Sequence, residues 1–194
     1  MNPIISPSVL FLGAPGLVGN HVIPALAEAG IRVRAGSRRG LAVAGAAGVP
    51  IDMRDPETLR RTMQEIDTVA FVIPDVIDME ALGLNVVAAA QSAGVSRLLW
   101  FSSFGASPKN EALFSRRHPV IDDAVRSSGI PYTILRPNFF MQDSPPSTGR
   151  PSEQRARFFC RWGMHGSVIS ICATLARQPS PCSGTIGISA AVTI

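Results

Sequence analysis

The chain has 194 residues, 46% of them hydrophobic and 16% charged, which suits one globular domain with a sizeable core and is too short for two domains of ordinary size. It has no run of about 18 uncharged apolar residues, so we expect no membrane-spanning helix, and its first residues lack the basic stretch of a signal peptide, so we expect a cytoplasmic protein. The net charge of +4 arises in residues 144–194, whose five arginines are dispersed without interleaved aromatic residues, so we expect no nucleic-acid partner.

Short apolar segments alternate with helix-length segments up to about residue 143. The patterns predict strands at residues 8–13, 31–37, 49–53, 67–74, 96–103 and 132–137. They predict helices at residues 19–30, 40–48, 55–66, 78–94 and 119–129. Asp55 is the expected N-cap of the third helix, with Pro56 at its first position. Near-continuous apolar strands separated by helices indicate an α/β fold, a doubly wound parallel sheet of six strands.

A glycine-rich turn lies between the first predicted strand and the first predicted helix. Small residues there allow a sharp turn and let backbone N–H groups approach a pyrophosphate at the positive end of the helix. The position of this turn within a strand–helix–strand unit predicts dinucleotide binding. The candidate residues are Gly13, Ala14, Pro15, Gly16, Leu17, Val18 and Gly19.

The end of the second predicted strand indicates which dinucleotide is bound. A carboxylate there would accept a hydrogen bond from the ribose 2′-OH of NAD, but residues 36–39 contain no acid. Arg38 can instead pair with a 2′-phosphate, and Ser37 can donate one more hydrogen bond. We therefore favour NADP(H) over NAD(H) and expect Arg39 to be a solvated surface residue.

Two further strand ends supply candidate cofactor contacts. Asp52 and Met53 follow the third predicted strand and would flank the adenine. Val72, Ile73 and Pro74 end the fourth and would line the ribose side. Ordinary packing at the ends of strands explains these five residues equally well.

Several stretches together resemble the NmrA-like family of atypical short-chain dehydrogenases/reductases, which includes NAD(P)H:quinone oxidoreductase-like members. They are "FLGAPGLVGNHVIPALAEAG", "VRAGSRR", "IDMRDPETL", "AAQSAGVSRLLWFSSFGA" and "HPVIDDAVRSSGIPYTILRPNFFMQD", within residues 8–143. The resemblance implies NADP in the cleft and a substrate pocket built mainly by the C-terminal segment. It adds the cofactor contacts Ser102, Ser103, Pro137, Asn138 and Phe139.

The usual catalytic pair of short-chain reductases, Tyr-x-x-x-Lys, is replaced here by Phe114 and His118. The resemblance implies direct hydride transfer from the nicotinamide to a small-molecule electron acceptor such as a quinone. His118 could donate a proton or contact the nicotinamide, and it could equally be an ordinary helix residue in the cleft wall. The cysteines, at 160, 172 and 182, match no zinc or redox spacing, and we expect no metal.

Residues 144–194 show none of the periodicity of the first 143 residues. A back-translation shifted by one frame at the codon of Asp143, with its free bases chosen for the match, yields a family-like continuation containing "HLDMRDIG". We therefore expect a dinucleotide-binding domain at 1–143 followed by a frameshifted tail at 144–194, and weakened activity. The candidate functions are an NADPH-dependent reductase of quinones or similar small electrophiles, a non-catalytic NADP sensor that binds a partner protein, and an inactive product.

Overall fold

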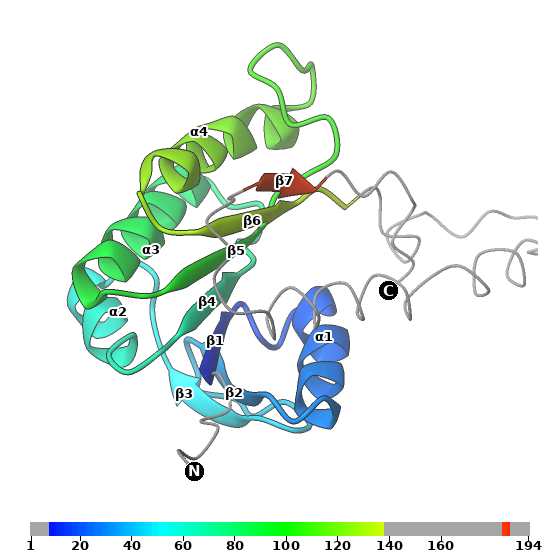
Figure 1. The fold of residues 1–194 in the computed structure, drawn as a ribbon. Helices are drawn as coiled ribbons and strands as arrows, with labels where there is room; N and C mark the ends of the chain where they lie inside the picture. The colour runs from blue at the N-terminus through cyan, green and yellow to red at the C-terminus, as the bar shows by residue number, and fades with distance from the viewer. Residues whose placement is uncertain (1–7, 138–183, 187–194) are drawn as a thin grey trace, which may run out of the picture.

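The computed structural model describes residues 8–137 and 184–186, which form a parallel sheet with helices on both faces (Figure 1). The strand order is β3-β2-β1-β4-β5-β6-β7, and every neighbouring pair is parallel. The strands are β1 (Ser8–Leu12), β2 (Arg32–Ser37), β3 (Ala47–Pro50), β4 (Thr68–Phe71), β5 (Arg97–Phe101), β6 (Tyr132–Leu135) and β7 (Gly184–Ile186). The predicted doubly wound α/β fold is confirmed.

Alternation along β1 divides the core between the two faces of the sheet. Leu10 and Leu12 are fully buried in a cluster with residues of α2 (Pro56–Thr62), α3 (Met79–Ala93) and α4 (Leu113–Ser127). Val9 and Phe11 are fully buried in a second cluster with α1 (Leu17–Glu28). Both faces of β1 are therefore apolar, which is why its sequence is continuous rather than alternating in hydrophobicity.

The ends of two helices follow directly from local sequence. The carboxylate of Asp55 accepts hydrogen bonds from the backbone N–H groups of Glu57 and Thr58, and Pro56 occupies the first helical position, as predicted. The hydrogen bonds from Thr58, led by that of its hydroxyl, lower the pKa of Asp55. α3 ends at Gly94, whose φ of 70° is the left-handed conformation that glycine adopts at low cost.

Two predicted elements differ from the structure. Instead of a helix at 40–48, residues 40–46 form turns closed by a bridge between Val43 and Ala46, and residues 47 and 48 begin β3. α4 begins at Leu113, six residues before the predicted start at Pro119, which lies inside the helix. Because a proline has no N–H, it leaves the carbonyl of Ser115 free, and this oxygen accepts the N–H of Ser107 instead.

The sheet also carries one strand more than the six predicted. β7 pairs in parallel with β6, with Ile134 opposite Thr185. The sheet therefore continues past β6 with residues from the segment that we expected to be irregular.

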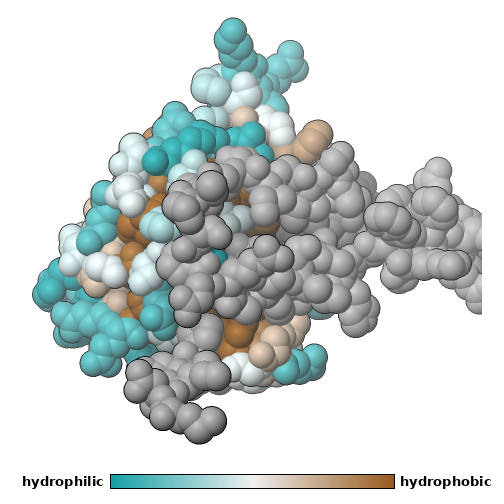
Figure 2. All heavy atoms as spheres, viewed as in Figure 1, coloured by the Kyte–Doolittle hydropathy of each residue, from teal (hydrophilic) through white to brown (hydrophobic). Residues whose placement is uncertain are grey.

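The hydropathy of the surface is that expected of helices that pack one face against the sheet and expose the other to solvent. Figure 2 shows mainly hydrophilic residues over α2 and over the loop before α4. Among the residues described, no helix combines the length and apolar character required to cross a membrane.

Candidate functional site

A cleft of about 1090 Å³ lies at the carboxyl ends of the parallel strands. It spans β1, whose neighbours β2 and β4 lead to opposite halves of the sheet. Ligands of doubly wound proteins bind at this point, because the crossovers on either side depart in opposite directions. The elements that carry the predicted residues therefore converge on one cavity.

The glycine turn forms the floor of the cleft beside β1. Gly13 has a φ of +82°, and a Cβ atom on it would lie 2.6 Å from the carbonyl oxygen of Val72. The N–H groups of Gly13 and Ala14 both donate to the carbonyl of Gly36, which ties the turn to β2. The turn is therefore closed by backbone contacts that leave no room for a side chain at Gly13.

Of the seven predicted turn residues, five line the cleft: Gly13, Pro15, Gly16, Leu17 and Val18. Ala14 and Gly19 do not line it, because they pack against each other beneath the turn. A Cβ atom on Gly19 would lie 2.1 Å from the carbonyl oxygen of Ala14. α1 begins directly after Gly16, its N-cap, which provides no side-chain cap. The backbone N–H groups of this helix end thus lie at the cleft, where an anion can accept from them.

The end of β2 brings Ser37 and Arg38 into the cleft wall. The hydroxyl oxygen of Ser37 accepts from the N–H of Leu41 at 3.0 Å, so its hydrogen remains free to donate. Arg38 is exposed and has no ion-pair partner within the described ranges. Arg39 is exposed and does not line the cleft, as expected. A cation and a hydroxyl donor therefore face the cleft here without a nearby acid on β2.

Asp52, Met53, Val72, Ile73 and Pro74 all line the cleft, beyond β3 and β4. Sequence reasoning missed the arginine between them. Arg54 lines the same wall and makes a bidentate pair with Asp78, at 2.7 and 3.1 Å, across the gap to the start of α3. This pair joins the loop after β3 to the loop after β4.

The opposite end of the cleft is formed by the ends of β5 and β6 and by α4. Ser102, Ser103, Pro137 and His118 line it, whereas the predicted contacts Asn138 and Phe139 lie outside the described residues. The hydroxyl of Ser102 is buried without a hydrogen-bond partner among residues 8–137 and 184–186, which is costly unless a ligand supplies one. His118 is 2% exposed and stacks on Trp100, with ring centroids 5.7 Å apart.

The loop between β5 and α4 supplies residues that sequence reasoning missed. Asn110 folds it back, donating to the carbonyl of Gly105 and accepting the N–H of Ala112. These residues were missed because α4 was expected to start only at Pro119. The full set of unpredicted lining residues is Ile51, Arg54, Asp75, Val76, Leu82, Phe101, Phe104, Gly105, Asn110, Ala112 and Ser115.

The residues present fit a dinucleotide. Its pyrophosphate suits the turn at Gly13, where the missing side chain allows close approach of the backbone. A negatively charged group suits the exposed Arg38 at one end, and a polar group suits the buried hydroxyl of Ser102 at the other.

Comparison with known proteins agrees with this geometry. The model of an NAD(P)H-binding family matches residues 13–170, past the expected boundary at residue 143. An NAD(P)H azoreductase of Xenophilus azovorans is 30% identical over 140 residues, covering 70% of this chain and 49% of the relative. An NmrA-like family domain-containing oxidoreductase of Aspergillus flavus is 27% identical, covering 49% of this chain and 33% of the relative.

A solved structure has a similar fold. The triphenylmethane reductase of a Citrobacter species, determined in complex with NADP(H), superposes with a TM-score of 0.61 at 26% identity. The match covers 70% of this chain and 50% of the reductase. The chain thus spans about half the length of this reductase and of the azoreductase.

Proposed function

Because the chain belongs to the NAD(P)H-binding family, as an NmrA-like atypical short-chain dehydrogenase/reductase, we propose that its cleft binds NADP(H) for the reduction of quinones or similar small electrophiles. The observation that carries the proposal is Arg38 at the end of β2. It lines the cleft as a cation without an ion-pair partner in the described residues, and no acid accompanies it on β2.

Arg38 and Ser37 would select the cofactor. The 2′-phosphate that distinguishes NADP from NAD is a dianionic acceptor, which a guanidinium can bind in bidentate fashion. Ser37 adds one hydroxyl donor, since its oxygen is already occupied by the N–H of Leu41. NAD(H) offers a neutral 2′-hydroxyl there, which can accept an ordinary hydrogen bond but cannot form the charge-assisted pair with Arg38.

Residues at the other end of the cleft would act during reduction. When bound, NADPH supplies a hydride, so a neutral acceptor also needs one proton. His118 lines that end, and imidazole is the side chain that most often serves as a proton donor in catalysis. The hydroxyl of Ser102, which has no partner in the described part of the chain, can donate to a carbonyl or amide oxygen bound there.

The wall of the cleft near His118 suits a flat conjugated acceptor. Val76, Leu82, Phe104 and Ala112 contribute apolar surface, and Phe104 is 56% exposed. The names of the two reductases compared above refer to azo compounds and to triphenylmethane dyes. Both are conjugated electrophiles of this kind. We propose acceptors of this class, with quinones included through the family.

Titration of the 194-residue chain with NADPH and NADH tests the cofactor proposal. We expect tighter binding of NADPH, and we expect Arg38→Gln to weaken NADPH binding about tenfold, as loss of one charge-assisted pair implies, while NADH is unaffected. Arg39→Gln removes the same charge from a residue outside the cleft and serves as the control. Equal loss in both variants, or no preference for NADPH in the unaltered chain, would refute the assignment.

The activity of this chain is a separate question. We propose that residues 144–194 are read out of frame and that turnover is therefore low or absent even if NADPH binds. Acceptor-dependent oxidation of NADPH measures it directly. Robust quinone reduction by the 194-residue chain would contradict the proposed impairment and leave the cofactor assignment in place.

The alternative function is a non-catalytic NADP sensor that binds a partner protein. It is compatible with the replacement of the usual Tyr-x-x-x-Lys pair by Phe114 and His118, which direct hydride transfer explains equally well. A version with the restored reading frame separates the two functions. A reductase oxidises NADPH when given a quinone, whereas a sensor binds both cofactor forms without acceptor-dependent turnover.

A further inference from the structure

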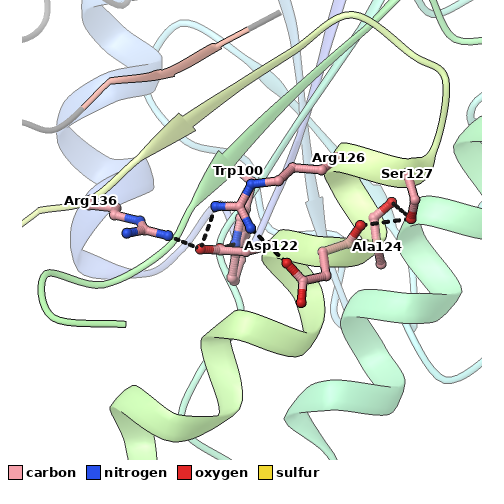
Figure 3. A network of polar contacts seen from close by, with 7 residues as sticks. Trp100, Asp122, Ala124, Arg126, Ser127 and Arg136 are labelled. Atoms are coloured by element: carbon pink, nitrogen blue, oxygen red, sulfur yellow. Dashed lines mark hydrogen bonds and ion pairs between the residues drawn. The ribbon is translucent and has the colours of Figure 1, made fainter. Parts of the chain in front are cut away.

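Asp122 of α4 has no exposed side-chain surface, yet its carboxylate contacts three side chains (Figure 3). Its Oδ1 accepts the indole N–H of Trp100, on β5, at 2.8 Å. Its Oδ2 pairs with Arg136, directly after β6, and lies 3.6 Å from a guanidinium nitrogen of Arg126. A fully buried carboxylate is tolerated only when its partners are held in place. The geometry of this group is therefore fixed by all three contacts together.

The first contact leads to His118. Trp100 is stacked between Phe71, at a centroid distance of 4.7 Å, and His118, at 5.7 Å. Because the indole N–H is held by Asp122, the plane on which His118 stacks cannot rotate freely. His118 also lies one helical turn before Asp122 on α4, so the two side chains share a face of the helix.

The second contact leads to Pro137. Arg136, the ion-pair partner of Asp122, immediately precedes Pro137, which lines the cleft. The carbonyl of Pro137 accepts the N–H of Phe104 at 2.9 Å, and Phe104 also lines the cleft. The ion pair therefore secures the end of β6 to α4 and, through Pro137, to the loop after β5.

Neither Asp122 nor Trp100 lines the cleft. We propose that Asp122 is a positioning residue for the cleft end opposite Arg38, and that its one carboxylate sets His118 through Trp100 and Pro137 through Arg136. The inference rests on the proposed function, because that end is where the nicotinamide half of NADP(H) would lie. Arg38 and the adenosine half lie at the far end, beyond β2, and do not depend on Asp122.

Two ligands distinguish positioning from general support of the fold. NADPH spans both ends of the cleft, whereas adenosine 2′,5′-bisphosphate reaches only the end at Arg38. Asp122→Asn keeps an oxygen for the indole N–H and removes the charge that Arg136 requires. We expect its dissociation constant for NADPH to rise about fivefold or more, with that for the bisphosphate unchanged, by calorimetric titration of the full chain. Asp123→Asn is the matched control, because it removes the same charge from the neighbouring, exposed residue.

Each outcome decides the proposal. A selective loss of NADPH affinity in Asp122→Asn, absent from Asp123→Asn, supports it. Equal losses for both ligands, or affinities equal to those of the control, overturn it and leave the cofactor assignment standing. If the unaltered chain binds neither ligand, the proposed function fails and this inference fails with it.

A second variant covers the case in which Asp122→Asn does not fold, as judged by circular dichroism. Trp100→Phe keeps an aromatic ring between Phe71 and His118 but removes the N–H that holds it. We expect the same selective weakening of NADPH binding, and a shift of the His118 ring-proton resonances. A variant that binds NADPH as the unaltered chain does would overturn the proposal.

Discussion

Gly13→Ala should damage both the stability of the fold and the affinity for NADPH. At the φ of +82°, the left-handed conformation costs an alanine about 1–2 kcal/mol, because its Cβ lies too close to the following carbonyl oxygen of its own backbone. Its Cβ would also lie 2.6 Å from the carbonyl oxygen of Val72, a backbone atom that cannot rotate away. Overpacking of this kind costs about 1–3 kcal/mol more. We therefore expect a loss of about 2–5 kcal/mol in the free energy of unfolding.

Gly94→Ala isolates the contribution of the contact with Val72. Gly94 has a φ of +70°, but a Cβ atom added to it would meet no heavy atom of the described residues within 4 Å, and it ends α3 away from the cleft. Denaturant unfolding should give it only the conformational cost, and NADPH titration should give unaltered affinity. If Gly13→Ala unfolds with the same free energy as Gly94→Ala and binds NADPH normally, the close approach at the turn does not restrict this position.

Three further predictions concern the fold and the tail. Hydrogen bonds from Thr58 lower the pKa of Asp55 in the folded chain. The contribution of its charge to stability is therefore present above the pKa of the unfolded chain and is lost as pH falls through the lower folded value. The melting temperatures of the unaltered chain and of Asp55→Asn should converge in acid, and a difference that widens there would contradict this. Gly83→Ala should lower the free energy of unfolding in denaturant by about 1–3 kcal/mol, because its Cβ would lie 2.6 Å from the side chain of Ile121. Adding Ile121→Val should recover part of this loss, and a double variant whose loss equals the sum of the two single losses would argue against direct contact. Sequencing the encoding DNA tests the proposed frameshift: a one- or two-base insertion or deletion near codon 144 should restore a family-like reading. If none does, residues 144–194 are not out of frame.

The regular strands were predictable because burial on both faces leaves a simple signal. Val9 and Phe11 face one core and Leu10 and Leu12 the other, so the pattern is a short continuous apolar run. The position of the cleft was predictable from the same strand pattern, since the carboxyl ends of parallel strands meet at one edge of the sheet. This is why the turn after β1 and the strand ends far along the sequence line one cavity.

The two wrongly predicted elements have causes in the local sequence. Residues 40–48 are small and apolar, which suggested a helix, but Gly40 and Gly45 adopt positive φ values and close turns instead. Pro119 looked like the first residue of a helix, although it lies inside α4 and its missing N–H is compensated by Ser107. Two partners of Asp122, Trp100 and Arg136, could not be predicted for another reason: they lie outside α4, and no sequence period encodes such contacts.

Cofactor selection and reduction are assigned to opposite ends of the cleft and to different parts of the chain. Ser37 ends β2 and Arg38 follows it, and β2 pairs with β1 and β3, which lie in the first 50 residues of the chain. The other end is built by α4 and by the residues that close β6, Arg136 and Pro137. If the proposed function is correct, the predicted contacts Asn138 and Phe139 belong to that end, and we expect a change in the C-terminal sequence to affect reduction before cofactor selection. Preference for NADPH and loss of turnover are compatible properties of one chain, and binding measurements report on the first without requiring the second.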